Sequence, residues 1–277
     1  MKERGGNLNK DIIPFLTWAG GKRWLVANHS ELFPSEFNTY LEPFLGSGAV
    51  FFAIKPERAI LNDLNAELMN TYEAIKNDYL KVEKYLKIHH RRHCKEYYYQ
   101  IRGSRTRTPY TNAAKFLYLN RTCFNGLYRV NKSGQFNVPI GSKKNAILET
   151  DEFRLVSKLL ENVELNVTDF ELVVNRANEG DFLFIDPPYT INHNENGFIE
   201  YNEKIFSWQD QERLAQSLVR ARDRGVKILA TNANHESVKK LYTDLNFNCR
   251  VLKRFSGIAS DGSKRAQYEE LIIKANY

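Results

Sequence analysis

Several features that would define other classes of protein are missing from this sequence of 277 residues. It has no run of about 18 apolar residues, so we expect no transmembrane helix. Residues 1–10 are polar and lack the apolar stretch of a signal peptide. The three cysteines, Cys94, Cys123 and Cys249, lie far apart and without the spacing of a metal site. The cysteine pattern argues against a disulfide framework or a zinc site and predicts a protein of the reducing cytoplasm.

Acidic residues are scarce in one part of the chain. Between residues 79 and 145 there are 15 Lys and Arg but only two acids, Glu83 and Glu96, whereas the whole chain carries a net charge of +7. The rest of the chain is therefore mildly acidic. Such a basic segment is either a solvated face or a surface that binds a polyanion, because Lys and Arg gain affinity for phosphates by releasing condensed counterions.

Outside the basic segment, short β-type runs alternate with helical patterns. The alternation predicts an α/β fold with a doubly wound, mostly parallel, seven-stranded Rossmann-like sheet. The last two strand candidates are joined by a polar stretch without a helix, so we expect them to pair antiparallel at one edge. The strand candidates are Thr39–Glu42, Ala59–Asn62, Glu164–Val167, Phe182–Ile185, Val226–Ala230, Cys249–Phe255 and Glu270–Lys274.

Residues 71–150 break this alternation and contain the whole basic segment. They hold helical patterns over Tyr79–Ile88 and Ala113–Arg121, followed by two β-type runs, Leu127–Asn131 and Gln135–Val138, around a Lys-Ser-Gly turn. A tight turn between two such runs is typical of a β-hairpin. We therefore predict an inserted domain of helices plus a β-hairpin at 71–150, within a larger domain formed by 1–70 and 151–277.

Two motifs follow the first two strand candidates. Glycines in the segment Glu42-Pro43-Phe44-Leu45-Gly46-Ser47-Gly48 allow a tight turn and the close approach of a ligand, although a plain turn explains them nearly as well. The third glycine of a dinucleotide fingerprint is absent, because Phe51 stands there. Asp63 after the second strand is placed either to accept ribose hydroxyls or to cap a helix. Together the two motifs predict an adenosine-type cofactor.

The sequence Asp186-Pro187-Pro188-Tyr189 directly follows the apolar strand candidate Phe182–Ile185. Prolines stiffen a loop and remove backbone donors, which leaves carbonyl groups as acceptors. The Asp186 carboxylate and the Pro187 carbonyl could accept both N–H bonds of an aromatic amine and make its lone pair available to an electrophile. Tyr189 could stack on the ring. This motif is the strongest functional signal in the chain.

With these motifs the chain resembles the Dam-type (class alpha) DNA adenine-N6 methyltransferases. The resemblance rests on four motifs in the family's order, Phe15–Lys22, Glu42–Gly48, Asn62–Asn65 and Asp186–Tyr189, and on Phe124–Arg129 and Phe136–Pro139 in the insertion. It implies a methyltransferase domain at 1–70 and 151–277 and a target recognition domain at 71–150. It also implies S-adenosylmethionine as methyl donor, S-adenosylhomocysteine as product, base flipping of duplex DNA and no metal.

The resemblance assigns roles residue by residue. The implied catalytic residues are Asp186, Pro187, Pro188 and Tyr189. The implied cofactor-binding residues are Trp18, Gly20, Gly21, Lys22, Glu42, Pro43, Phe44, Gly46, Ser47, Gly48, Asp63, Asp169, Phe170 and Asp186. The implied DNA-binding residues are Arg121, Phe124, Asn125, Gly126, Leu127, Arg129, Asn137 and Pro139, among which Arg129 matches the position that reads a guanine.

The family pattern also implies a target of GATC or a site containing GAT. It further implies a monomer of bacterial or phage origin, which either acts alone or accompanies a cognate restriction endonuclease that acts separately. Thr17 departs from the pattern, since many relatives have Lys before the tryptophan, and the segment Arg102–Thr108 matches no family motif. Two alternatives stay open. One is amino methylation of cytosine, which the acid at Asp186 disfavours, and the other is a DNA-binding regulator without catalysis on the same fold.

Overall fold

A computed structural model describes residues 11–131, 133–190, 206–255 and 267–277 of the chain. These residues form two compact units, which we describe separately. Unit 1 comprises Met1–Asn28, Gly46–Glu57 and Asp63–Val167, and unit 2 comprises His29–Leu45, Arg58–Asn62 and Thr168–Tyr277. The predicted insertion at 71–150 lies within unit 1, but unit 1 also includes the N-terminal segment and the glycine-containing turn.

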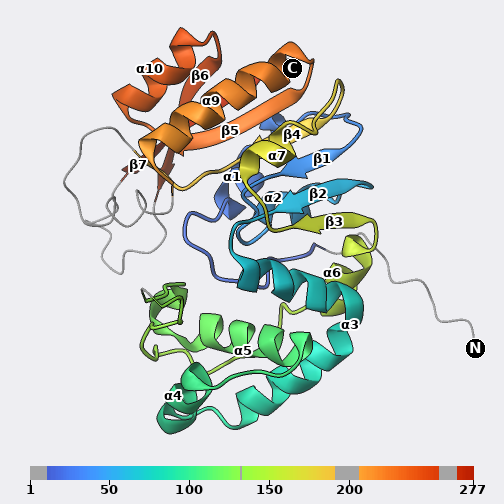
Figure 1. Cartoon of the computed structure of the whole chain (residues 1–277), viewed down its shortest axis with the longest axis vertical. Coiled ribbons are helices and arrows are strands. Elements are labelled where there is room, and N and C mark those ends of the chain that lie inside the picture. Colours follow the sequence, from blue (N-terminus) through green and yellow to red (C-terminus); the bar gives the residue numbers. More distant parts are fainter. Residues whose placement is uncertain (1–10, 132, 191–205, 256–266) are drawn as a thin grey trace, which may run out of the picture. The chain divides into compact units, whose positions relative to one another are not determined.

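The described residues form a seven-stranded sheet with the strand order β3-β2-β1-β4-β5-β7-β6 (Figure 1). Strands β1, β2, β4 and β5 pair in parallel, whereas β7 pairs antiparallel with both β5 and β6. This confirms the α/β fold with a mostly parallel sheet and an antiparallel pair at one edge. The strands are β1 Tyr40–Glu42, β2 Ala59–Asn62, β3 Val163–Asn166, β4 Phe182–Ile185, β5 Lys227–Ala233, β6 Asn248–Phe255 and β7 Gln267–Ala275.

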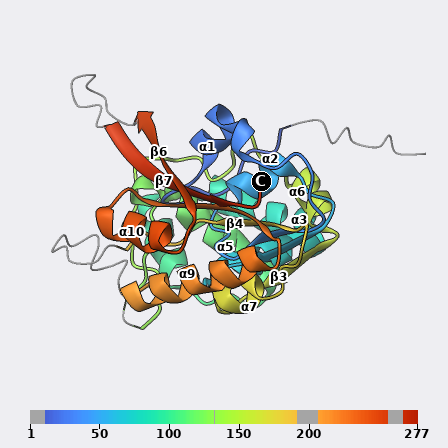
Figure 2. The same ribbon diagram turned by 90° about the horizontal axis from the view of Figure 1, so that it is seen from above.

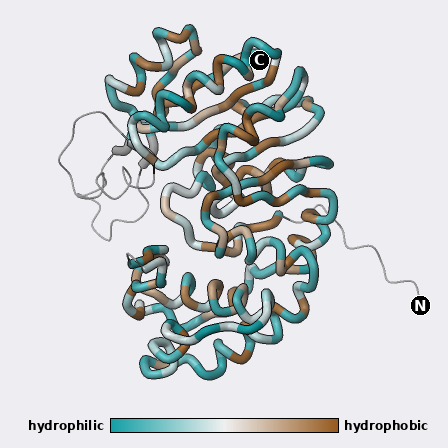
Figure 3. The backbone as a smooth tube through the Cα atoms, viewed as in Figure 1, coloured by the Kyte–Doolittle hydropathy of each residue, from teal (hydrophilic) through white to brown (hydrophobic). Residues whose placement is uncertain are grey.

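In unit 2, three helices lie on the same side of strands β4 and β7, as the view in Figure 2 shows. They are α7 Phe170–Val174, α9 Trp208–Asp223 and α10 Glu236–Asp244, and the short helix η1 spans Ser30–Leu32. Helix α9 begins with a capping box between Ser207 and Asp210. Apolar residues concentrate along the central strands, where all four residues of β4 are buried (Figure 3).

Unit 1 consists mainly of helices. They are α1 Arg23–Asn28, α2 Ala49–Ile54, α3 Ala66–Arg91, α4 Lys95–Gly103, α5 Pro109–Thr122 and α6 Phe153–Leu160, with the short helix η2 at Phe124–Gly126. The helical patterns predicted at 79–88 and 113–121 lie within α3 and α5. Thr108 caps α5 and Pro109 occupies its first turn, where a missing N–H costs nothing. No helix among the described residues is long and apolar enough to cross a membrane.

In place of the predicted β-hairpin, the insertion has a turn flanked by an isolated β-bridge. Val130 bridges antiparallel to Phe136, and the Asn131 N–H donates to the Gln135 carbonyl at 2.8 Å. The Asn131 side-chain oxygen also accepts from the backbone N–H of Ser133 and Gln135, at 3.0 and 2.9 Å. This side chain organises the turn locally, so the described part of the hairpin is held by one bridge and side-chain bonds rather than by two extended strands. Lys132 lies outside the described residues.

Candidate active site and cofactor site

The Asp186-Pro187-Pro188-Tyr189 loop begins where strand β4 of unit 2 ends. Because β4 is buried along its whole length, the backbone that presents Asp186 is fixed by the core. On the neighbouring strand β5, the Thr231 hydroxyl donates to Asp186 Oδ1 at 2.8 Å. Thr231 is fully buried, whereas Asp186 is partly exposed. The carboxylate therefore has a defined orientation at the edge of the sheet where ligands of such folds bind.

Tyr189 is held at its hydroxyl by an acid on strand β7. The hydroxyl donates to Glu270 Oε2 at 2.9 Å, and Glu270 is only 3% exposed. Burial, together with the charges of Asp186 and Glu270, raises the pKa of Tyr189 well above its ordinary value. Tyr189 therefore remains a neutral phenol whose ring direction is set by the bond to Glu270.

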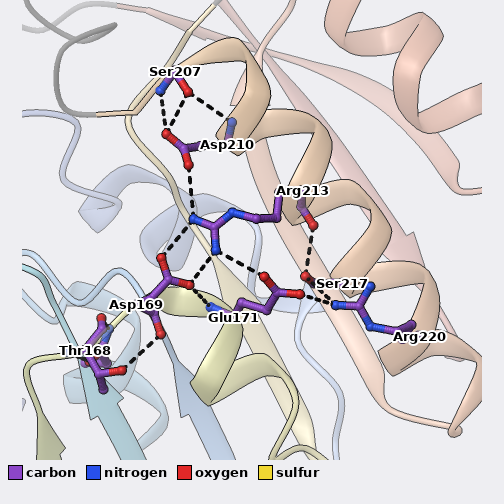
Figure 4. Close-up of polar contacts among 9 residues, drawn as sticks. Thr168, Asp169, Glu171, Ser207, Asp210, Arg213, Ser217 and Arg220 are labelled. Carbon is purple, nitrogen blue, oxygen red and sulfur yellow. Dashed lines mark hydrogen bonds and ion pairs between the residues drawn. The ribbon is translucent and has the colours of Figure 1, made fainter.

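A second polar cluster of unit 2 surrounds the start of helix α7 (Figure 4). Asp169 caps this helix and accepts from the Glu171 N–H at 2.9 Å. Arg213 on α9 donates to both oxygens of Asp169, with distances of 2.7 and 2.8 Å, and its guanidinium lies 4.3 Å from the centre of the Phe170 ring. Hydrogen bonding by Arg213 lowers the pKa of Asp169, so the acid is ionised at neutral pH.

The aromatic residues predicted at the cofactor site pack on one another. Phe170 contacts Phe44 with ring centres 5.5 Å apart and Phe206 at 5.7 Å. The Phe170 side chain is almost completely buried at 3% exposure. Phe170 thus forms the wall that supports Asp169 and Arg213, rather than an open stacking surface.

Asn62 ties together the segments that follow β1 and precede α7. Its side-chain amide donates to the carbonyls of Pro43 and Thr168, at 2.9 and 3.0 Å, and its side-chain oxygen accepts from the Thr168 N–H at 2.9 Å. Glu42 at the end of β1 is buried and accepts from the Tyr40 hydroxyl at 2.8 Å. The first three residues of the predicted motif Glu42–Gly48 and the predicted cofactor residues Asp169 and Phe170 are therefore organised within unit 2.

In unit 1, the glycine-containing turn is bonded to Asp63. The Gly46 N–H donates to Asp63 Oδ2 at 3.0 Å and the Asn65 N–H donates to Oδ1 at 2.9 Å, while burial raises the pKa of the acid. Gly46 has φ +49°, and a Cβ there would come within 2.8 Å of the Trp18 ring. Only glycine fits this position. Gly48, with φ 66°, precedes helix α2.

The N-terminal motif of unit 1 packs on the predicted target recognition region. The Trp18 ring stacks on Tyr128 at 5.5 Å between ring centres. Lys22 is buried, and its Nζ donates to the Gly20 carbonyl at 2.7 Å. Gly21 and Ser47 are neighbours, since a Cβ at Gly21 would lie 3.6 Å from Ser47 Oγ. The structure thus brings Trp18, the Gly20–Lys22 turn and Gly46–Gly48 together.

Thr17, the departure from the family pattern, is a packing residue. A Cβ at Gly126 would lie 2.5 Å from Thr17 Cγ2, and Gly126 has φ +64°. Asn120 joins the same contact by accepting from the Thr17 N–H at 3.0 Å and donating to the Thr17 carbonyl at 2.8 Å. Thr17 therefore supports the loop that presents the exposed side chains of Phe124 and Leu127.

Arg129 is an exposed residue beside the hairpin turn. Its Nε donates to Asn137 Oδ1 at 2.8 Å, and the Asn137 N–H donates to the Arg129 carbonyl at 3.1 Å. The predicted DNA-binding residues Phe124, Asn125, Leu127, Arg129 and Pro139 are all exposed, Asn137 is partly exposed, and Gly126 is buried beneath them.

Arg121 has a different place from the one predicted. It is buried, and its guanidinium donates to the carbonyls of Phe15 and Ala146 and to both oxygens of Asp151, at 2.6 to 3.1 Å. These bonds engage all three guanidinium nitrogens. Arg121 therefore links three segments of unit 1, and we do not retain it among the DNA contacts.

Three residues of the site were missed from the sequence: Thr231, Glu270 and Arg213. Thr231 follows directly after the predicted strand Val226–Ala230, so a polar residue at that strand end was a usable signal. Glu270 is the first residue of the predicted strand Glu270–Lys274, directly before three apolar residues, and could have been noticed as a buried acid. Arg213 lies on the polar side of an amphipathic helix, where no sequence pattern distinguishes it from a solvated arginine.

Comparison with known proteins identifies the family of the chain. The chain matches the model of D12 class N6 adenine-specific DNA methyltransferases over residues 18–258. It is 36% identical over 276 residues to the type II methyltransferase M1.LlaDCHI of Lactococcus lactis subsp. cremoris, covering 96% of both chains. It is 35% identical to the type II methyltransferase M.MjaIII of Methanocaldococcus jannaschii, covering 95% of this chain and 99% of the relative. The DNA adenine methylase of Escherichia coli (strain K12) is 30% identical, with 93% of both chains covered.

The fold and the matched motifs define an adenine-specific DNA methyltransferase. The chain belongs to the D12 class of N6 adenine-specific DNA methyltransferases.

Proposed function

We propose that this enzyme transfers a methyl group from S-adenosylmethionine to the N6 amine of an adenine flipped out of duplex DNA. The observation that supports this most strongly is the fixed acceptor at the end of β4, where Thr231 donates to Asp186 at 2.8 Å. An amine conjugated with an adenine ring is a poor nucleophile. Acceptance of its two N–H bonds by the Asp186 carboxylate and the Pro187 carbonyl withdraws the nitrogen lone pair from the ring and directs it to the methyl group.

Preorganised acceptors of this kind stabilise a transition state in which positive charge develops on the amine. Tyr189, anchored through Glu270, stacks on the flipped base, and Pro187 and Pro188 keep the loop rigid. The base must leave the helix, because an amine inside stacked duplex DNA cannot reach such a loop.

The chemistry of the predicted cofactor residues fits an adenosyl sulfonium compound. Asp63, whose burial is offset by N–H donors from Gly46 and Asn65, is a suitable acceptor for ribose hydroxyls. Asp169 is a suitable acceptor for the amine of the cofactor's adenine. We propose that Trp18, Lys22 and residues 42–48 hold the methionine end. The cofactor supplies an electrophilic methyl group. The chain's own residues bind and orient the cofactor and the target base, and they exclude water.

We further propose that the exposed residues around 124–139 read the DNA and that Arg129 pairs with a guanine in a GATC or GAT-containing site. A guanidinium has the paired donors that match guanine O6 and N7. The bond that Arg129 Nε donates to Asn137 Oδ1 would hold the Arg129 side chain in a reading position. The type II names of two relatives support a role beside a restriction endonuclease that acts separately. We propose that this chain works as a monomer.

Expression of the chain in a host lacking adenine methylation, followed by sequencing of methylated bases, tests this proposal in one measurement. We expect N6-methyladenine at a single short sequence that contains GAT. Methylation at N4 of cytosine, or scattered adenine modification without a common sequence, would contradict the proposal. An Asp186→Ala strain serves as the control and should leave the DNA unmodified.

A further inference from the structure

Arg213 stands at the centre of an ionic cluster beside the residues proposed to hold the cofactor's adenine (Figure 4). It extends from helix α9 and bonds to three acids of unit 2. The distances are 2.7 and 2.8 Å to Asp169, 3.1 Å to Glu171 and 3.0 Å to Asp210. The guanidinium carbon also lies over the Phe170 ring, 4.3 Å from its centre.

This arrangement is more constrained than an ordinary surface ion pair. Isolated exposed pairs contribute little because two flexible side chains must be held in one geometry. Here a planar fork meets a carboxylate with two parallel bonds, and an aromatic ring supports it from one side. The ring is itself fixed, because Phe44 and Phe206 pack against Phe170.

The two oxygens of Asp169 are not equivalent. Oδ1 accepts from Arg213 Nη1 and from the Glu171 N–H, whereas Oδ2 accepts from Arg213 Nη2 alone among the residues that the structure describes. A carboxylate oxygen has two acceptor sites. Oδ2 therefore keeps one site, and the Asp169 side chain is 39% exposed, so that a ligand can reach it.

The Phe170 ring offers little to a ligand, since it is 3% exposed and contacts Phe44, Phe206 and Arg213. Recognition of the cofactor's base beside Asp169 therefore depends on the edge of that base and its substituents, rather than on stacking over the Phe170 ring. The exocyclic amine of adenine is a donor that matches the remaining site on Asp169. The oxo group of hypoxanthine at the same position is an acceptor and would face a negative charge.

We propose that Arg213 is a positioning residue that fixes the Asp169 carboxylate so that Oδ2 accepts the amine of the cofactor's adenine, which makes the enzyme select adenosyl over inosyl cofactors. This proposal rests on the proposed function of the chain as an S-adenosylmethionine-dependent enzyme. Removal of Arg213 leaves Asp169, Glu171 and Asp210 to repel one another and frees the carboxylate to rotate. Selectivity for the amine is then lost.

The test is the affinity of the purified protein for S-adenosylhomocysteine and for its inosyl analogue, measured by calorimetry. We expect the wild type to prefer the adenosyl compound by a factor on the order of 100, since a site built to accept a donor rejects an analogue that lacks it. Arg213→Met should reduce this preference to within a few-fold. Arg213→Lys should restore only part of it, because an ammonium cannot donate two parallel bonds.

Arg220→Met is the matched control. Arg220 lies on the same helix and bonds to Glu171 without a bond to Asp169 among the described contacts, so this variant should keep the adenosyl preference. Asp169→Asn provides a second route that leaves Arg213 in place. A carboxamide can donate through its NH₂ group, so this variant should bind the inosyl compound relatively better than the wild type does.

The outcomes separate the two proposals. If Arg213→Met lowers the affinity for both compounds equally, Arg213 has a merely structural role and the inference is overturned. If the affinities for both compounds stay at their wild-type values, the inference is overturned as well. Should Arg213→Met fail to fold, an unchanged adenosyl preference in Asp169→Asn would overturn it instead. Wild-type protein that binds neither compound would refute the proposed function itself.

Discussion

Replacing Thr231 by valine removes the hydroxyl that donates to Asp186 at 2.8 Å while keeping the shape of a fully buried side chain. A hydrogen bond to a charged group contributes about 1.5–3 kcal/mol. If about 2 kcal/mol of that orients Asp186 in the transition state, the rate of methyl transfer falls about 30-fold, since each 1.4 kcal/mol is roughly a factor of ten. The affinity for DNA should change little.

The assay is single-turnover methyl transfer to a short duplex with saturating protein, because this reports the chemical step apart from product release. Thr231→Ser is the matched control, since it keeps the hydroxyl, and it should stay close to the wild-type rate. A Thr231→Val protein that transfers methyl groups at the wild-type rate would refute the view that this bond positions the acceptor.

Three further predictions concern specificity, stability and pH. Arg129→Ala should lose about 1–3 kcal/mol of discrimination at one guanine, and equal weakening on all duplexes in a binding titration would reduce Arg129 to a phosphate contact. Arg121→Met should lower the free energy of unfolding by about 3–5 kcal/mol, since Asp151 is left as a buried, unpaired charge; denaturant titration would contradict this with a change below about 1 kcal/mol. Burial lowers the pKa of His89 to about 4, so the folded protein holds this ring neutral while the unfolded chain protonates near its ordinary value of about 6.5. Stability should therefore fall as the pH drops from about 6.5 toward 4, less steeply in His89→Gln, and equal slopes for the two proteins would exclude His89 as the cause.

The central strands of the sheet were predictable where they are apolar runs bounded by turns, because a buried strand needs little else to be found. Phe182–Ile185, for example, has the same bounds in the structure as in the prediction. The Asp186–Tyr189 loop was predictable for a related reason, since an acid followed by two prolines has few structural explanations at the end of a strand.

The partners of these residues were harder to find, because they come from elements far away in the sequence. Thr231 lies 45 residues beyond Asp186 and Glu270 lies 81 residues beyond Tyr189. Arg121 was misplaced for the same reason. The family resemblance implied a DNA contact for this arginine, and nothing in the local sequence reveals that Asp151 and the Phe15 carbonyl bind it instead.

The insertion shows a third kind of difference. Its turn was correctly located, but alternation of residue types does not reveal that the Asn131 side chain accepts from Ser133 and Gln135. Side-chain bonds of this kind organise a loop without a regular ladder.

The central claim is that the Asp186 loop makes an adenine amine nucleophilic enough to take the donor's methyl group. Its most direct test compares wild-type and Asp186→Ala protein in one turnover with labelled donor and a target duplex, followed by identification of the methylated nucleoside by mass spectrometry. The account predicts N6-methyldeoxyadenosine from the wild type and no detectable product from the variant, which should still bind the duplex. Product formation by Asp186→Ala near the wild-type rate would contradict it.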